Sequence, residues 1–195
     1  MSKRILLIQG HPDNSTPHLC HALAASYTEG AVLSGFSVRQ CVVADLDFPL
    51  LRSQKDFETG SLPAVLQEAQ DDVLWSEHVL LIFPLWAGGM PALLKGFLEQ
   101  VFRPDFTGTS RNPLVKKPLS GRSARVVVTM AMPALIYRWY FRAHSVKSLE
   151  RNLLGMVGIG PVSETLVGLT DGMQAEDAAK WLTKLKTLGE RADCS

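Results

Sequence analysis

The chain has 195 residues, of which 46% are hydrophobic and 20% charged, and its formal net charge is +1. This length suits one α/β domain with a buried core, the composition is that of a globular protein, and the charge argues against nucleic-acid binding. No apolar stretch reaches the roughly 18 residues of a membrane span, and the N-terminal apolar run is shorter than the roughly 7–15 residues of a signal-peptide core. The three cysteines have no metal-binding spacing. We therefore expect a cytoplasmic protein without a metal site.

Continuous apolar or β-branched runs predict five buried strands, at residues 3–9, 38–44, 79–83, 124–130 and 162–167. Segments with apolar residues at helical spacing predict helices at residues 17–33, 62–75, 91–102, 134–154 and 176–190. Thr16 is expected to cap the first helix, and Pro91 to open the third. The connection at 103–122 has the length of a lid or binding loop. The alternation of strands and helices predicts one parallel sheet with right-handed crossovers, in a single domain over residues 1–195.

The loop after the first predicted strand, residues 10–18, has the residue types of a phosphate site. It leads into a helix N-terminus, which presents free N–H groups and a positive dipole end. Ser15 and Thr16 offer hydroxyl donors, and His11 and His18 offer charge or further N–H donors. The glycine patterns of Rossmann and P-loop proteins are absent. Phosphate binding and simple helix capping by Ser15 and Thr16 are both compatible with this loop.

The turn after the strand at residues 79–83 has the residue types of a planar-cofactor site. It contains an aromatic residue and two glycines at a strand's carboxyl end, which is the edge where planar cofactors dock in open α/β sheets. Glycines let the backbone approach a ring closely, and Trp86 is suited to stack on it or border it. The expected cofactor contacts are Pro84, Leu85, Trp86, Ala87 and Gly88. The alternative makes Trp86 a core aromatic and the glycines ordinary turn formers.

The segment from Phe83 to Phe97 closely resembles the flavin-contacting turn of flavodoxin-fold NAD(P)H:quinone reductases, the DT-diaphorase-like NAD(P)H dehydrogenase (quinone) family. In that family a Phe-Pro-Leu turn and a Pro-Ala-x-Leu-Lys-Gly helix start hold the isoalloxazine ring. The corresponding residues here are 83–85 and 91–96. The resemblance covers nearly the whole chain in element order. It implies an α/β flavodoxin-like fold, with a five-stranded parallel sheet of order 2-1-3-4-5 and helices on both faces.

The same resemblance assigns roles in the loop at residues 10–18. Family members use a His, a Ser/Thr pair and then Phe-Asn to bind the flavin phosphate, which implies cofactor contacts for His11, Ser15, Thr16 and His18. Here Pro17 and His18 stand where Phe and Asn are usual. Because this change alters the adenine-side contacts, FMN is favoured as the cofactor, with FAD as the alternative.

The end of the fourth strand and the segment after it are expected to face the same cleft. Thr129, Met130 and Ala131 are candidate flavin contacts. Family members carry a Tyr and a His shortly after this point that accommodate charge on the reduced flavin. By order along the chain, their counterparts here are Tyr137 and His144, which we therefore consider as catalytic residues. The alternative is that the aromatic segment at 134–141 packs against the sheet or a second subunit.

Two aromatic residues are candidates for substrate binding. The family has an aromatic loop after the third helix that covers the ring, and Phe106 lies at this place. Phe106 and Trp86 are therefore expected to contact substrate, although Phe106 could equally be an ordinary hydrophobic anchor.

The resemblance implies a flavin oxidoreductase that passes a hydride from NAD(P)H to a quinone or nitroaromatic acceptor by a ping-pong scheme. It also implies a homodimer with sites at the subunit boundary. One alternative is a regulatory ancillary subunit of a potassium-efflux transporter in the membrane. A second is a one-electron carrier of the flavodoxin type, although such carriers are usually strongly acidic and this chain is not. A third is an α/β domain that has lost its cofactor.

Overall fold

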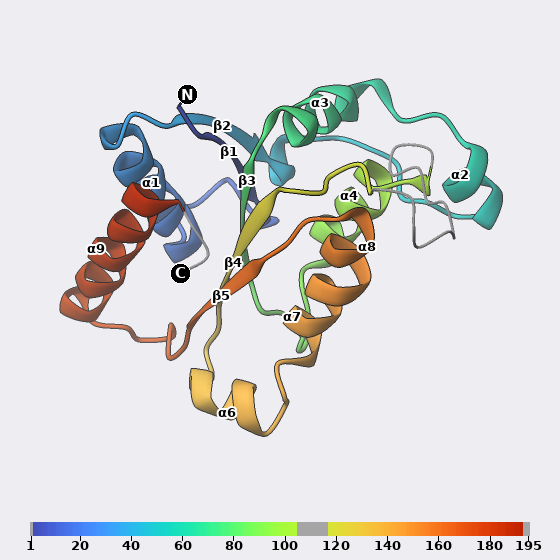
Figure 1. Cartoon of the computed structure of the whole chain (residues 1–195). Helices are drawn as coiled ribbons and strands as arrows, with labels where there is room; N and C mark the ends of the chain where they lie inside the picture. Colours follow the sequence, from blue (N-terminus) through green and yellow to red (C-terminus); the bar gives the residue numbers. More distant parts are fainter. Residues whose placement is uncertain (1, 105–116, 193–195) are drawn as a thin grey trace.

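A computed structural model describes residues 2–104 and 117–192 and contains a five-stranded, fully parallel sheet. Its strands are β1 (Arg4–Gln9), β2 (Ser37–Val42), β3 (His78–Pro84), β4 (Ser123–Thr129) and β5 (Val162–Val167). The order is β2-β1-β3-β4-β5, which confirms the predicted topology (Figure 1). All seven residues of β3 are buried, because helices cover both faces of a parallel sheet.

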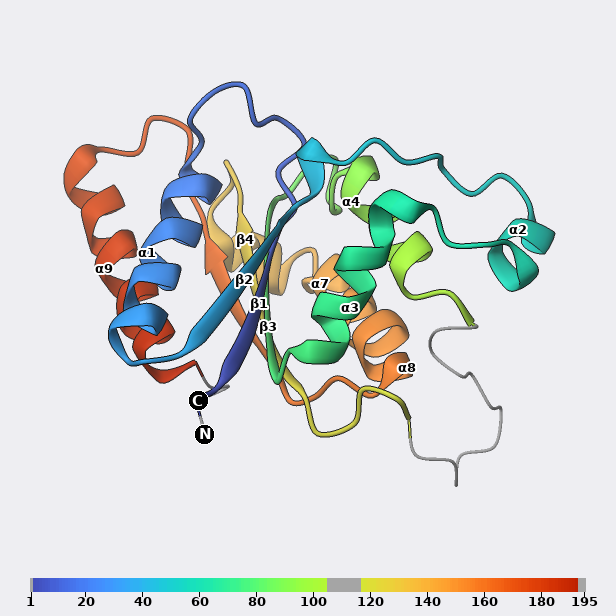
Figure 2. The same cartoon turned by 90° about the horizontal axis from the view of Figure 1, so that it is seen from above.

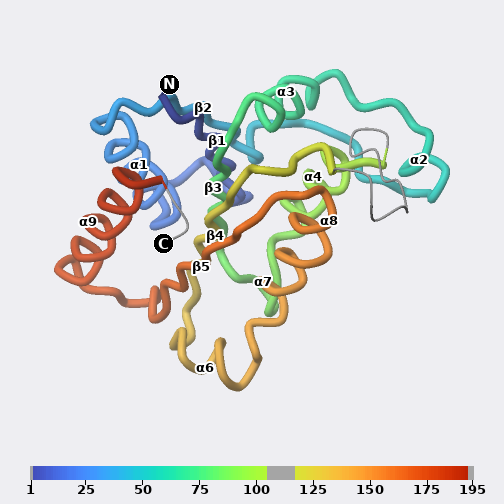
Figure 3. The backbone as a smooth tube through the Cα atoms, viewed as in Figure 1, coloured from blue at the N-terminus to red at the C-terminus, as the bar shows by residue number. Residues whose placement is uncertain are grey.

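Helices form a layer on each face of the sheet (Figure 2). The first layer consists of α1 (Leu19–Leu33) and α9 (Ala175–Arg191). The second contains α3 (Gln67–Trp75), α4 (Ala92–Val101), α7 (His144–Ser148), the π-helical η3 (Leu149–Leu154) and α8 (Gly155–Val157). The remaining elements are the short helices α2 (Gln54–Thr59) and α6 (Ala134–Trp139) and the 3₁₀ turns η1 (Val43–Asp45) and η2 (Ala64–Leu66). The backbone tube shows α6 below both layers (Figure 3).

Two apolar cores lie on opposite faces of the sheet. The larger core packs α3, α4 and the segment from α7 to α8 against the sheet, and the smaller packs α1 and α9. In the smaller core the two helices approach closely at Gly30 and Gly189. A Cβ added at either glycine would lie 2.0 Å from a carbonyl oxygen of the other helix. The helix crossing therefore requires both glycines.

Several expected element boundaries differ from those in the structure. The helix predicted at residues 134–154 is interrupted where Arg142 (φ 55°) and Ala143 (φ 46°) adopt left-handed backbone conformations. The first helix begins at Leu19 with His18, not Thr16, at its N-cap, because the Thr16 hydroxyl binds Asp13 instead. Pro91 is the N-cap of α4 rather than its first residue, and α2 was not predicted. Within residues 2–104 and 117–192, no helix has both the length and the apolar character needed to cross a membrane.

Candidate functional site

A pocket of about 330 Å³ lies at the carboxyl edge of the sheet, and we call it the edge pocket. It is bordered by the segments that follow β1, β3, β4 and β5. Its lining residues are His11, His18, Leu19, Cys20, Pro84, Leu85, Trp86, Thr129, Met130, Ala131, Thr170 and Asp171. The order β2-β1-β3 makes this edge the switch point of the sheet, where open α/β sheets bind their ligands. The volume is in the range of small-molecule pockets.

The turn after β3 is a tight two-residue hairpin. The backbone N–H of Trp86 donates to the Gly89 carbonyl, and that of Gly89 donates to the Trp86 carbonyl, each at 2.9 Å. The two central residues, Ala87 (φ 48°) and Gly88 (φ 78°), both have positive φ, as a type I′ turn requires. The Trp86 side chain is 52% exposed. The hairpin therefore presents an indole ring at the pocket rather than burying it in the core.

Asp13 organises the polar loop after β1. One carboxylate oxygen accepts the backbone N–H of Ser15 at 2.8 Å and the Ser15 hydroxyl at 2.6 Å. The other accepts the Thr16 hydroxyl at 2.8 Å and pairs with Nε2 of His18 at 2.7 Å. These hydrogen bonds hold the pKa of Asp13 well below its usual range. The Ser15 and Thr16 hydroxyls thus donate to a carboxylate of their own loop, and neither residue lines the edge pocket.

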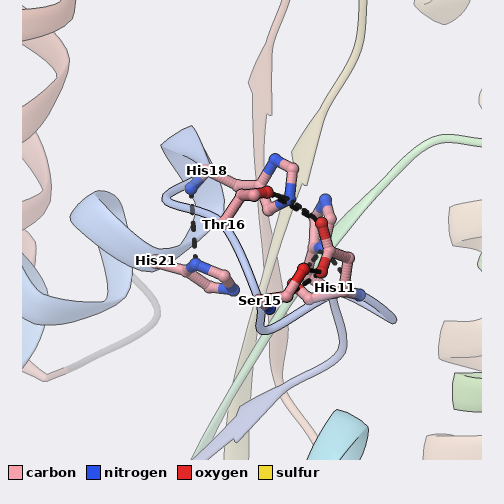
Figure 4. A network of polar contacts seen from close by, with 6 residues as sticks. His11, Ser15, Thr16, His18 and His21 are labelled. Atoms are coloured by element: carbon pink, nitrogen blue, oxygen red, sulfur yellow. Dashed lines mark hydrogen bonds and ion pairs between the residues drawn. The ribbon is translucent and has the colours of Figure 1, made fainter.

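Three histidine rings gather where this loop enters α1 (Figure 4). The rings of His11 and His18 stack with centroids 3.8 Å apart, and the His21 ring lies 5.4 Å from each of them. Burial lowers the pKa of His11 and His21, and the proximity of His18 lowers both further. Nε2 of His21 is buried and has no hydrogen-bond partner among the described residues. Burial therefore favours the neutral form of His11 and of His21, and one unused ring nitrogen lies near the N-terminus of α1.

The start of α1 and the ends of β3 and β4 are joined at the base of the edge pocket. The Thr129 carbonyl accepts the backbone N–H of Leu85 at 2.8 Å, and its hydroxyl lies 3.2 Å from Sγ of Cys20. Burial raises the pKa of the Cys20 thiol to about 11, so this cysteine stays protonated at neutral pH. Cys20 therefore contributes to the pocket wall without acting as a thiolate nucleophile.

The structure brings together eight of the predicted site residues in the edge pocket: His11, His18, Pro84, Leu85, Trp86, Thr129, Met130 and Ala131. Ala87, Gly88 and His144 instead line a neighbouring hollow of about 530 Å³. Tyr137 lies in the larger core, where it is 1% exposed, and burial raises its pKa. It does not line either cavity. Phe106 lies outside the described residues.

Sequence reasoning missed several residues of this edge. Thr170 and Asp171 follow β5 and line the edge pocket beside Leu19 and Cys20. Thr170 and Asp171 could have been predicted from the sequence. The strand β5 was expected, and its carboxyl end had to reach the same edge of the sheet as the ends of β3 and β4. The role of Asp13 as a shared acceptor had no comparable signal, since it depends on how the loop folds back.

The flavodoxin-like fold family matches residues 3–188, which is nearly the whole chain, and the chain belongs to this family. A stretch of 110 residues is 28% identical to an uncharacterized NAD(P)H oxidoreductase of Haemophilus influenzae, covering 55% of this chain and 54% of the relative. The match thus spans about half the length of that curated relative.

Solved structures with similar folds include two enzymes whose names state a cofactor or a substrate. An NAD(P)H:quinone oxidoreductase of Methanothermobacter marburgensis superposes with a TM-score of 0.82 over 98% of this chain and 97% of its own, at 19% identity. An FMN-dependent NADH-azoreductase of Bacillus anthracis, solved with FMN, gives a TM-score of 0.74 over 98% and 100%, at 14% identity. At these identities the similarity establishes the fold.

The edge pocket fits a phosphorylated planar cofactor. The stacked rings of His11 and His18 line the end of the pocket where α1 begins, and helix N-termini bind phosphate. At the other end, the exposed Trp86 ring and the β4 backbone border a space suited to an aromatic ring. One contact opposes this fit. The hydroxyls of Ser15 and Thr16 already donate to the Asp13 carboxylate, so a bound phosphate would have to compete with Asp13 for these two donors.

Proposed function

We propose that this protein is a flavin-dependent NAD(P)H oxidoreductase that reduces a quinone or nitroaromatic acceptor by two electrons. The observation that carries the proposal is the meeting of three segments at one pocket: the histidine-rich loop, the Trp86 hairpin and the end of β4. The resemblance to flavodoxin-fold quinone reductases predicted a flavin contact in each of these segments. The family membership and the named relatives support the proposal.

Each segment has a distinct task in the proposed enzyme. His11, His18 and the start of α1 would hold the phosphate, with Ser15 and Thr16 joining if Asp13 releases them. The backbone of residues 84–88 and of Met130 and Ala131 would contact the edges of the ring. A bound flavin supplies the centre that accepts a hydride and passes it on. The chain itself would contribute position, stacking and hydrogen-bond donors, since the thiol of Cys20 in the pocket wall stays protonated.

NAD(P)H and the acceptor would use the same open space in turn, which gives ping-pong kinetics. Trp86 is half exposed at the mouth of the edge pocket and would stack on either compound. His144 lines the adjoining hollow and would interact with the bound substrate there, while its Nδ1 is held 2.7 Å from the Phe141 carbonyl. Tyr137 would support the site only indirectly, by packing in the larger apolar core.

FMN is the cofactor that we favour, with FAD as the alternative. His18 occupies the place where the family's adenine-side contacts are expected, and its ring stacks on His11. The FMN bound by the azoreductase relative supports this choice.

We also propose that the protein is a homodimer that associates through α6. Leu135, Trp139 and Tyr140 are 70%, 76% and 80% exposed, and no described element covers them. Exposed apolar residues concentrated on α6 and its C-cap residue Tyr140 mark an interaction surface.

An absorbance spectrum of the purified protein, followed by chromatography of any released chromophore, tests the proposal. We expect flavin bands that NAD(P)H bleaches and that a quinone restores, with FMN as the released compound. Parallel assays with a quinone, a nitroaromatic and an azo dye would rank the acceptors. A colourless protein that also fails to bind added FMN or FAD would contradict the proposal and favour a regulatory or cofactor-free role.

A further inference from the structure

Two cavities outside the edge pocket adjoin each other beside α4, and we call them together the groove. The first, the turn-side hollow, has about 530 Å³ and is bordered by Gly88, Gly89 and His144. The second, the α2-side hollow, has about 320 Å³ and is bordered by Leu51, which precedes α2, and by Phe57 of α2 itself. The two hollows share the lining residues Lys95, Asn152 and Leu153.

The groove begins at the hairpin that also borders the edge pocket. Trp86 lines the edge pocket, and the next residues, Ala87 and Gly88, line the turn-side hollow. A ligand whose reacting group lies at Trp86 could therefore extend past the hairpin and between α4 and η3. The groove and the edge pocket are neighbouring parts of one surface.

Both hollows have mainly apolar walls, and polar side chains are more frequent at the hairpin end. The turn-side hollow is lined by His144, Ser145 and Ser148. The apolar lining residues of the α2-side hollow are Leu51, Phe57, Leu98, Phe102, Leu153 and Met156. This lining matches a ligand with a polar head near the hairpin and an apolar chain that points toward α2.

The charged residues of the groove neutralise each other. Lys95 at its centre forms an i,i+4 ion pair with Glu99, and both side chains are about half exposed. With its charges paired in this way, the α2-side hollow is poorly suited to a phosphate or nucleotide, which needs unpaired cations. An uncharged chain could lie against the apolar wall without breaking this pair.

We propose that the groove binds the apolar side chain of the acceptor, so that the enzyme prefers quinones with an isoprenoid or alkyl tail over tail-less ones. This inference rests on the proposed function and names the substrate class of its site. The quinone head would lie at the Trp86 hairpin, and the tail would pass Lys95 and Asn152 to reach Met156. Burial of the tail against the α2-side wall would supply the added affinity.

A series of quinones with one head group and increasing tail length tests the inference. For the wild type we expect KM to fall by roughly tenfold between the tail-less compound and one with two isoprene units, while kcat changes little. Met156→Lys places a charge in the α2-side hollow at a residue that is 42% exposed, so folding should persist. This variant should lose the dependence on tail length and keep wild-type kinetics with the tail-less quinone.

Two controls separate the groove from general effects of charge and shape. Val32→Lys introduces the same charge at a residue 57% exposed on α1, on the opposite face of the sheet, and should keep the dependence on tail length. Met156→Leu keeps the apolar wall and should also keep the dependence of KM on tail length.

Binding without turnover distinguishes a failure of this inference from a failure of the proposed function. Equilibrium dialysis of the tailed quinone against the protein should show weaker binding to Met156→Lys, whatever the activity. A wild type that reduces all members of the series with the same KM would overturn the inference and leave the oxidoreductase intact. A Met156→Lys variant that changes the oligomeric state but not the tail dependence would also overturn it, and would assign the groove to a second copy of the chain.

Discussion

Asp13 is a carboxylate beside the edge pocket that already holds the side chains expected to bind a phosphate there. It accepts hydrogen bonds from Ser15 and Thr16 and pairs with His18, which are the donors expected to bind a phosphate. In Asp13→Asn the loop keeps an acceptor for Ser15 but loses the negative charge. We expect affinity for FMN to rise roughly twofold to fivefold, the scale of exposed ion pairs. Quenching of flavin fluorescence measures it.

Riboflavin and a second acidic residue provide the controls for this substitution. Riboflavin has no phosphate, so its affinity should be nearly the same in the wild type and in Asp13→Asn. Asp45→Asn removes an equal charge from a residue that binds Asn14 of the same loop, and should have the smaller effect on FMN. Equal gains for FMN and riboflavin would show that Asp13 does not compete with the phosphate.

The histidine cluster predicts two opposite responses to pH. Burial lowers the pKa of His11 and His21 below the ordinary 6.5, so the unfolded chain binds more protons than the cofactor-free protein just below that pH. The stability of the cofactor-free protein is therefore complete above about 6.5 and decreases as the pH falls below it. A bound phosphate dianion raises both pKa values, so FMN should bind more tightly at pH 6 than at pH 8.

The measurement for this prediction is a pair of pH series, one of urea unfolding without flavin and one of flavin affinity. The affinity for riboflavin, which has no phosphate, should not increase at low pH. His11→Gln should weaken the pH dependence in both series, because it removes one of the two titrating rings, the one that is stacked on His18. An FMN affinity that is the same from pH 6 to pH 8 would rule out proton uptake by the cluster.

Among the elements, the hairpin after β3 stores backbone strain next to the site. Ala87 has φ 48°, a conformation that costs a non-glycine residue about 1 kcal/mol. Ala87→Gly should raise the free energy of unfolding by up to about 1 kcal/mol, and Ala87→Val should lower it by about 1–2 kcal/mol. Urea unfolding measures both. Ala25→Gly, at an exposed position inside α1, should destabilise by about 1 kcal/mol and serves as the control.

The crossing of α1 and α9 gives a prediction in which packing and helix propensity have opposite signs. Propensity alone predicts that Gly30→Ala stabilises α1 by up to about 1 kcal/mol. A Cβ at this position would lie 2.0 Å from the Lys186 carbonyl oxygen, so the helices would have to move apart. We expect a loss of about 2–3 kcal/mol in urea unfolding. Gly35→Ala, at a positive φ with open space around it, separates backbone strain from this clash.

The elements that the sequence predicted best are those with a simple apolar pattern. The five strands were predicted from buried runs such as residues 79–83, and their order from the resemblance to flavodoxin-fold reductases; the structure has both. The break between α6 and α7 could not be predicted, since Arg142 and Ala143 adopt left-handed conformations without a glycine to signal them. The site followed the same rule: residues fixed by strand ends were predicted to meet, whereas the fold of the loop around Asp13 was not.

For the whole molecule, α6 is the surface whose exposure most needs an explanation. Trp139 and Tyr140 are among the most exposed large side chains described, and each aromatic residue buries about 150–250 Å² when covered. With Leu135 and Phe141 they could supply much of the roughly 800 Å² that each partner buries in a standard interface. Aromatic residues of this kind dominate the binding energy of interfaces. We therefore expect a dimer with twice the 21.4 kDa mass of the chain.

Light scattering after size-exclusion chromatography tests this at several protein concentrations. The double variant Trp139→Ser with Tyr140→Ser should elute as a monomer, because losing two interface anchors weakens association by about 2 kcal/mol or more. The matched control is Val32→Ser with Leu33→Ser, which removes two side chains 57% and 68% exposed at the end of α1 and should leave the dimer intact. A wild type that is monomeric at all concentrations would mean that α6 contacts something other than a second copy. If the double variant also loses flavin as it becomes monomeric, the partner subunit contributes to the edge pocket; if it retains flavin, each chain holds its cofactor alone.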